Sequence, residues 1–157
     1  MSKIISMDDI IPLMKEQLEH NGEVTFTPKG VSMLPMLRSN RDTVTLCRVR
    51  FPLKKYQVAL YLRDNGQYVL HRIVGIEHDR YIMRGDNQFI DEPGIREDQI
   101  IAIVDRFNRK GREYTCSSKL YILYYKIWVN TVGIRKGLRR ARRIAGKLKR
   151  KILRIFK

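Results

Sequence analysis

The sequence predicts a mainly β body with a helix before it and a basic helical tail after it. Between Glu23 and Phe107, short runs rich in β-branched and aromatic residues alternate apolar with polar positions, and turn signals separate the runs. At 157 residues, of which 43% are hydrophobic, the chain can bury one modest core. We therefore expect an N-terminal helix in residues 1–21, one globular domain in residues 22–116 and a tail in residues 117–157.

The N-terminal segment carries a helical pattern. Apolar residues between Ile10 and Leu18 recur at helical spacing, and Asn21-Gly22 ends the pattern. We expect this helix to pack on the body. Asp8 and Asp9 interrupt the first apolar residues and no small-residue cleavage site follows, so no signal peptide is expected.

Turn residues place the strands of the body. Asn65-Gly66 lies between two apolar runs and is a strong hairpin signal, while residues 77–80 and 108–111 indicate two further tight turns. Residues 56–63, 67–77 and 80–84 should therefore form a meander. The strand-like runs are residues 24–28, 43–49, 57–63, 67–76, 81–85 and 100–107.

Three kinds of residue in the body are the parts of a nucleophilic site. Ser32 lies in the constrained stretch KGVSMLPML, residues 29–37, and His71 lies in the apolar run YVLHRIVGI. The carboxylates Asp86 and Asp91 follow in YIMRGDNQFIDEP. A serine hydroxyl becomes a useful nucleophile only when a neighbouring base takes its proton, and a carboxylate can orient a histidine base.

The order of these motifs resembles the superfamily of serine peptidases that contains signal peptidases and self-cleaving repressors. The resemblance covers approximately residues 22–110 and implies the β fold of that superfamily. It implies that Ser32 is the nucleophile and that His71, followed by Arg72-Ile73, is the general base of the histidine type. The motifs are Gly30-Val31-Ser32-Met33-Leu34-Pro35, Arg41-Asp42-Thr43-Val44, His71-Arg72-Ile73-Val74 and Gly85-Asp86-Asn87.

The same resemblance assigns the remaining site residues. Asp86 matches the acid that orients the base, with Asp91 as the second candidate. Gly30 allows a close backbone approach, the Ser32 N–H is a candidate oxyanion donor, and Met33 is expected in the pocket wall. Apolar neighbours should keep His71 neutral. No metal and no organic cofactor are expected.

These residues predict a small serine endopeptidase that cleaves a peptide or a precursor of the signal or leader type, presented as an extended strand. Two alternatives remain. One is a catalytically inactive peptide-binding module, and the other is a DNA-associated regulator. The two cysteines, Cys47 and Cys116, lack the spacing of a disulfide framework or a zinc site, which favours a reduced, cytoplasmic setting.

All the excess positive charge lies in the last third of the chain. Residues 1–108 contain 15 Lys/Arg and 15 Asp/Glu, whereas residues 109–157 contain 17 Lys/Arg and one acid. Tail aromatics such as Trp128 suit a membrane interface. The tail's apolar residues then recur at intervals of three and four, which predicts a basic amphipathic helix; they are Ile134, Leu138, Ala141, Ala145, Leu148, Ile152 and Ile155.

Such a helix suits an anionic membrane, nucleic acid or an acidic partner peptide. Nucleic-acid binding by charge alone does not require an apolar stripe, so we favour the membrane. We therefore expect a cytoplasmic protein that can lie peripherally on the inner face of the membrane.

Overall fold

The computed structural model of the chain describes the backbone of residues 7–155 and the side chains of residues 10–146. Helix α1 opens the described part, eight strands and a short 3-10 helix follow, and two helices close it. The elements are α1 (Met7–Asn21), β1 (Glu23–Phe26), β2 (Thr43–Cys47), β3 (Val58–Leu62), β4 (Tyr68–Glu77), β5 (Arg80–Arg84), β6 (Glu92–Ile95), η1 (Glu97–Gln99), β7 (Ile100–Arg109), β8 (Arg112–Thr115), α2 (Lys119–Asn130) and α3 (Val132–Ile155).

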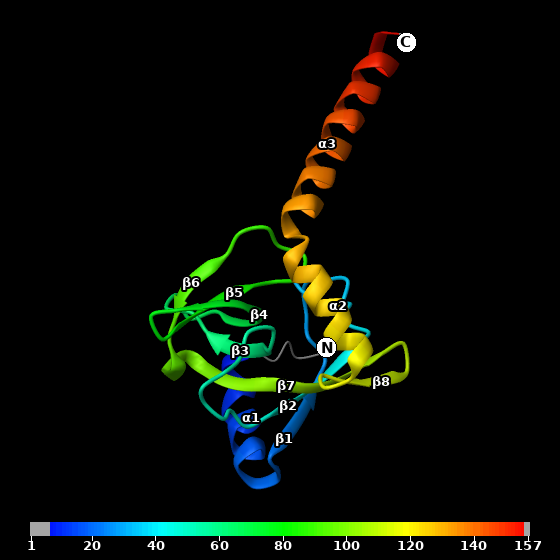
Figure 1. Cartoon of the computed structure of the whole chain (residues 1–157). Coiled ribbons are helices and arrows are strands. Elements are labelled where there is room, and N and C mark those ends of the chain that lie inside the picture. Colours follow the sequence, from blue (N-terminus) through cyan, green and yellow to red (C-terminus); the bar gives the residue numbers. More distant parts are fainter. Residues whose placement is uncertain (1–6, 156–157) are drawn as a thin grey trace.

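The eight strands form one antiparallel sheet, which confirms the predicted β-rich body. Its order is β1-β2-β7-β3-β4-β5-β6, and β8 pairs with β7. The long strand β7 therefore joins the early strands β1 and β2 to the β3-β4-β5 meander (Figure 1). Strand β6 contains Pro93 and Gly94 and was not predicted, because both residues are rare inside strands.

The predicted turns are confirmed. Residues 63–67 connect β3 to β4, with Gly66 at a φ of 81° and the Arg63 N–H bonded to the carbonyl of Gln67. The β4–β5 and β7–β8 hairpins have two-residue loops, His78-Asp79 and Lys110-Gly111, whose central residues all have positive φ. This backbone twist matches the twist of paired strands.

Helix α1 covers one face of the sheet, as predicted. Its buried residues Ile11, Met14 and Leu18 are at most 4% exposed and follow helical spacing, whereas Leu13 faces solvent. They join the core cluster that also contains Val44 and Leu46 of β2. The side chains of residues 1–9 lie outside the described part of the chain.

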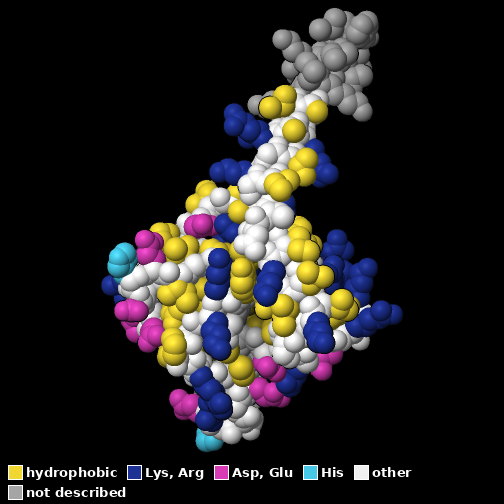
Figure 2. Space-filling model, viewed as in Figure 1, with side chains coloured by type: hydrophobic (Ala, Val, Ile, Leu, Met, Phe, Trp, Pro, Cys, Tyr) yellow, Lys and Arg dark blue, Asp and Glu magenta, His cyan; other side chains and the backbone are white. Residues whose placement is uncertain are grey.

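The tail comprises two helices with different surroundings. Helix α2 packs on the body through Tyr121 and Val129, both buried, while α3 projects away from it (Figures 1 and 2). The aromatic residues that we expected at a membrane interface therefore pack on the body instead. Tyr121 packs on Phe107 with tilted rings whose centroids lie 5.1 Å apart, and Tyr125 stacks on Tyr56 at 5.0 Å.

None of the helices within residues 7–155 combines the length and the apolar character needed to cross a bilayer.

Candidate active site

Ser32 lies in the loop that connects β1 to β2. The loop coils tightly here, because the Leu37 N–H bonds to the carbonyl of Met33 at 2.9 Å and anchors a turn whose buried side chains belong to the core. Gly30 enters the turn with a φ of 98°, which favours glycine. Ser32 is half-buried at the surface of this packed loop.

A buried carboxylate holds the far end of the same loop. Asp42 is fully buried; it accepts the Arg38 N–H at 2.8 Å and two hydrogen bonds from the Arg41 guanidinium at 2.6 and 2.8 Å. The hydrogen bond from Arg41 holds the pKa of Asp42 below its usual value. Arg41, the adjacent residue in the chain, thus neutralises this buried carboxylate.

His71 projects from the middle of β4 into the protein. It pairs with Ala59 of β3 and its side chain is only 2% exposed. Burial, reinforced by the positive charge of Arg63, lowers the pKa of His71 to about 4. The imidazole is therefore neutral at physiological pH, as expected from its apolar surroundings.

The neighbour of the His71 ring is a tyrosine rather than an aspartate. The hydroxyl of Tyr61, on the adjacent strand β3, lies 3.2 Å from Nδ1 of His71 and donates to Glu92 Oε2 at 2.7 Å. Glu92 also accepts two hydrogen bonds from Arg63, at 2.6 and 2.7 Å. Partial burial opposes ionisation of Glu92, but the hydrogen bonds from Arg63 and Tyr61 prevail and lower its pKa.

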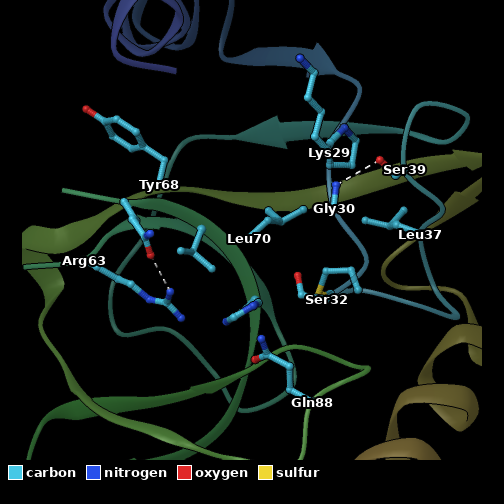
Figure 3. Close-up of a pocket in the computed structure, with 14 residues that line it drawn as sticks. Lys29, Gly30, Ser32, Leu37, Ser39, Arg63, Tyr68, Leu70 and Gln88 are labelled. Carbon is cyan, nitrogen blue, oxygen red and sulfur yellow. Dashed lines mark hydrogen bonds between the residues drawn. The ribbon is translucent and has the colours of Figure 1, made fainter. Parts of the chain in front are cut away.

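Ser32 and His71 line the same cavity, of about 510 Å³. The β1–β2 loop forms one wall, with Pro28, Lys29, Gly30, Ser32, Met33, Leu37 and Ser39. Gln67 and residues 68–71 of β4 form another, and Arg63 and Gln88 complete the lining (Figure 3). Among the described residues, Lys29 is the one lysine in this lining. No hydrogen bond joins Ser32 to His71 within the described part of the chain.

The loop after β5 lies against both residues. The Asn87 N–H donates to the carbonyl of Ser32 at 2.8 Å, and its side-chain amide donates to the carbonyl of Val31 at 3.2 Å. A Cβ at Gly85 would lie 2.7 Å from the Ser32 carbonyl oxygen and 3.0 Å from His71 Nε2. Only glycine fits here, so Nε2 and the Ser32 carbonyl both lie close to Gly85.

Asp86 belongs to a different network from the one we expected. Its two carboxylate oxygens each accept a hydrogen bond of 2.8 Å from Arg72, and both side chains are at most 1% exposed. Tyr124 of α2 donates to the same carboxylate at 3.2 Å, and Trp128 donates to the Asp86 carbonyl at 2.7 Å. Asp86 therefore joins the site loop to α2.

Asp91, the second candidate, pairs with Arg84 at 2.7 Å and is half exposed. Among the described residues, neither Asp86 nor Asp91 forms a hydrogen bond or an ion pair with His71, so the structure does not bring them to the imidazole. The backbone N–H groups of the expected oxyanion residues differ in whether they already have an acceptor. The Gly30 N–H donates to Ser39 Oγ at 3.0 Å, whereas the N–H groups of Ser32 and Met33 have no acceptor within the described residues.

The sequence interpretation missed Tyr61, Glu92 and Gly85 as site residues. Alternation could have suggested Tyr61, because it lies two residues from Ala59, the partner of His71, and so shares its face of the sheet. Gly85 belongs to the motif Gly85-Asp86-Asn87, which by itself indicates no role for the glycine. No local signal distinguishes Glu92 from the neighbouring Asp91.

The comparisons with protein-family models and with curated proteins find no match to this chain.

Proposed function

We propose that this chain is a serine endopeptidase of the signal-peptidase-like type, with Ser32 as nucleophile and His71 as general base. The observation that carries the proposal is the placement of both residues on one cavity, with Nε2 of a neutral, buried His71 and the Ser32 carbonyl both close to Gly85. The motif order seen in the sequence supports the same pair.

The hydrogen-bond chain around His71 selects the tautomer that a base requires. Tyr61 has one hydroxyl proton, and it is donated to the ionised Glu92. The remaining contact, between Tyr61 Oη and His71 Nδ1, is then made by an Nδ1–H donor. That tautomer leaves the Nε2 lone pair free to accept the Ser32 proton. We propose that Tyr61 and Glu92 together take the role we had assigned to Asp86.

The chemistry follows from these positions. Ser32 Oγ attacks the scissile carbonyl carbon as its proton passes to His71 Nε2, and the carbonyl π electrons move to the oxygen. The N–H groups of Ser32 and Met33 stabilise that oxyanion. The C–N bond then breaks as His71 protonates the leaving amine. His71 then deprotonates a water molecule, which attacks the acyl-enzyme carbonyl. As the ester C–O bond breaks, His71 returns the proton to Ser32 Oγ.

The backbone around the cavity suits an extended substrate. Residues 68–71 of β4 pair with β3 on one side, but pairing with β5 begins only at Arg72. The other edge of these four residues has no strand partner among the described residues, and all four line the cavity together with Lys29, Gly30 and Ser32. A peptide can add there as a strand, and its backbone hydrogen bonds would align the scissile carbonyl with Ser32.

A second candidate function is peptide capture without cleavage. It is favoured by the lack of a hydrogen bond between Ser32 and His71 among the described residues, and by the weak basicity of an imidazole whose pKa is about 4. Hydrogen bonds of catalytic pairs are often formed only once substrate binds. Both functions use the same cavity and differ only in turnover.

The test is cleavage of a peptide library by the full chain, followed by mass spectrometry. We expect product from the wild type, and a loss of at least about 1000-fold in rate for Ser32→Ala and for His71→Ala. Matched controls are Ser117→Ala and His20→Ala, because both residues lie outside the cavity lining. Binding of peptides without any product would instead establish the capture function.

Cleavage that survives His71→Ala would overturn the assigned base. Lys29 would then be tested first, because it lines the cavity of Ser32. Lys54 and Lys55 line a separate cavity together with Cys47 and Cys116, so they are poorer candidates.

A further inference from the structure

Helices α2 and α3 expose a row of large apolar side chains. Six of them are 54% to 80% exposed, although single exposed apolar residues are ordinary on protein surfaces. We call this row the exposed stripe; its residues are Leu120, Leu123, Ile127, Ile134, Leu138 and Ile144.

The exposed stripe runs along both helices, and the junction at Thr131 keeps only part of the helical hydrogen-bond pattern. The Thr131 N–H bonds to the carbonyl of Ile127, and the Arg135 N–H bonds to the carbonyl of Thr131, both at 3.0 Å. The Trp128 carbonyl instead accepts a hydrogen bond from the Arg135 side chain at 2.9 Å, so helical spacing applies to each helix separately. Steps of three and four residues place Leu120, Leu123 and Ile127 on one face of α2, and Ile134 and Leu138 on one face of α3, with Ile144 at its edge.

A different face of the same helices contacts the body. Trp128 and Arg135 donate to the Asp86 carbonyl, and the Arg139 guanidinium lies 5.2 Å from the centre of the Phe89 ring. By helical spacing this face is roughly 100° around the axis from the exposed stripe. The stripe is therefore available without any change in how the helices pack on the body.

The charge of α3 discriminates among three candidate partners for this surface: a second copy of the chain, nucleic acid and an anionic membrane. Helix α3 contains eleven Lys/Arg and no Asp/Glu, so a second copy of the chain would bring like charges together. Nucleic acid would satisfy the charge but leave the aliphatic stripe exposed to water. An anionic lipid surface satisfies both, because acyl chains bury the stripe while acidic headgroups attract the cations. We infer that the exposed stripe docks the protein on an anionic membrane.

Docking would also position the candidate active site. Trp128 and Arg135 hold Asp86, and the adjacent Asn87 holds the Ser32 carbonyl, so the cavity is attached rigidly to the helix that meets the lipid. Peptides at the membrane surface would then be the accessible substrates. This consequence rests on the proposed function, whereas docking itself does not.

The test is flotation of the full chain with vesicles of phosphatidylglycerol and phosphatidylcholine, and with phosphatidylcholine alone. We expect the wild type to float with the anionic vesicles, and less so at high salt. The stripe variant, Leu123→Gln, Ile134→Gln and Leu138→Gln, keeps the charge and good helix formers. Its partition coefficient should fall at least about ten-fold.

The matched control replaces three exposed apolar residues elsewhere, by Leu13→Gln, Ile76→Gln and Ile90→Gln, and should float as the wild type does. A charge variant, Lys136→Gln, Arg140→Gln and Arg143→Gln, should lose binding mainly at low salt. Circular dichroism checks that each variant is folded. Equal flotation of the stripe variant and wild type would overturn the inference, as would tighter binding to duplex DNA than to anionic vesicles. Self-association through the stripe without flotation would also overturn it.

Discussion

The hydroxyl of Tyr61 lies 3.2 Å from Nδ1 of His71 and donates its proton to Glu92. This contact arises from strand register, since His71 pairs with Ala59 and Tyr61 follows two residues later on β3. The buried imidazole thus has one ring nitrogen in a polar network and the other close to Gly85, as the Ser32 carbonyl is. The first predictions test whether this network orients the base.

We predict that Tyr61→Phe and Glu92→Gln each lower kcat by about 100-fold or more, because either change removes the group that holds the Nδ1–H tautomer. Asp91→Asn is the control, since Asp91 pairs with Arg84 at the surface, and its kcat should stay within about two-fold of wild type. Steady-state kinetics on a cleaved peptide measure these values. Near-normal kcat in both Tyr61→Phe and Glu92→Gln would remove the network from the mechanism.

Asp86→Asn should lower the stability of the fold and should have no direct effect on the catalytic step. The substitution leaves Arg72, which is fully buried, without its charged partner, and such a loss destabilises proteins by about 3–5 kcal/mol. Urea unfolding of the variant and of wild type measures the difference in the free energy of unfolding. A variant that unfolds like the wild type but has lost turnover would return the orienting role to Asp86.

The pH dependence of turnover should report the low pKa of His71. Only the neutral imidazole can accept the Ser32 proton, so kcat/KM should rise as pH increases through about 4 and then stay level through neutral pH. Burial lowers the pKa because it disfavours the charged form. A profile that keeps rising above pH 8 would indicate a lysine base instead.

Gly85→Ala should abolish turnover. The new methyl group would meet the Ser32 carbonyl at 2.7 Å and His71 Nε2 at 3.0 Å, so it would separate the two groups. Gly133→Ala is the matched control, because a Cβ there meets nothing within 4 Å, and it should keep full activity. Peptide cleavage by both variants, with thermal unfolding to confirm that they fold, provides the comparison. Full activity of Gly85→Ala would show that the serine loop does not need this close approach.

Chain truncation should separate the roles of the two C-terminal helices. A chain ending at Thr131 keeps α2 and should remain folded. A chain ending at Cys116 loses the buried Tyr121 and should be destabilised by about 3–5 kcal/mol or more. Denaturant unfolding measures the free energy of unfolding of both chains. Equal values would place α2 outside the folding unit, which would then end at residue 116 as the sequence suggested.

Features that depend on neighbouring residues were predictable from the sequence. Alternating β-branched runs predicted most of the strands, and Asn65-Gly66 predicted the first hairpin, because side-chain alternation and left-handed backbone preferences act over a few residues. The order of the motifs likewise placed Ser32 and His71 together as candidates, and the structure brings both to one cavity.

Tertiary structure alone decided which partners these residues meet. Asp86, Asp91 and Glu92 are close along the chain, yet they pair with Arg72, Arg84 and Arg63 respectively. In the same way, the aromatic residues of α2 suit a membrane or a core equally well by composition, and packing against β7 and Asp86 placed them on the body. The physical reason is that hydrogen bonds and ion pairs depend on distances of about 3 Å, which the registers of strands remote in sequence determine.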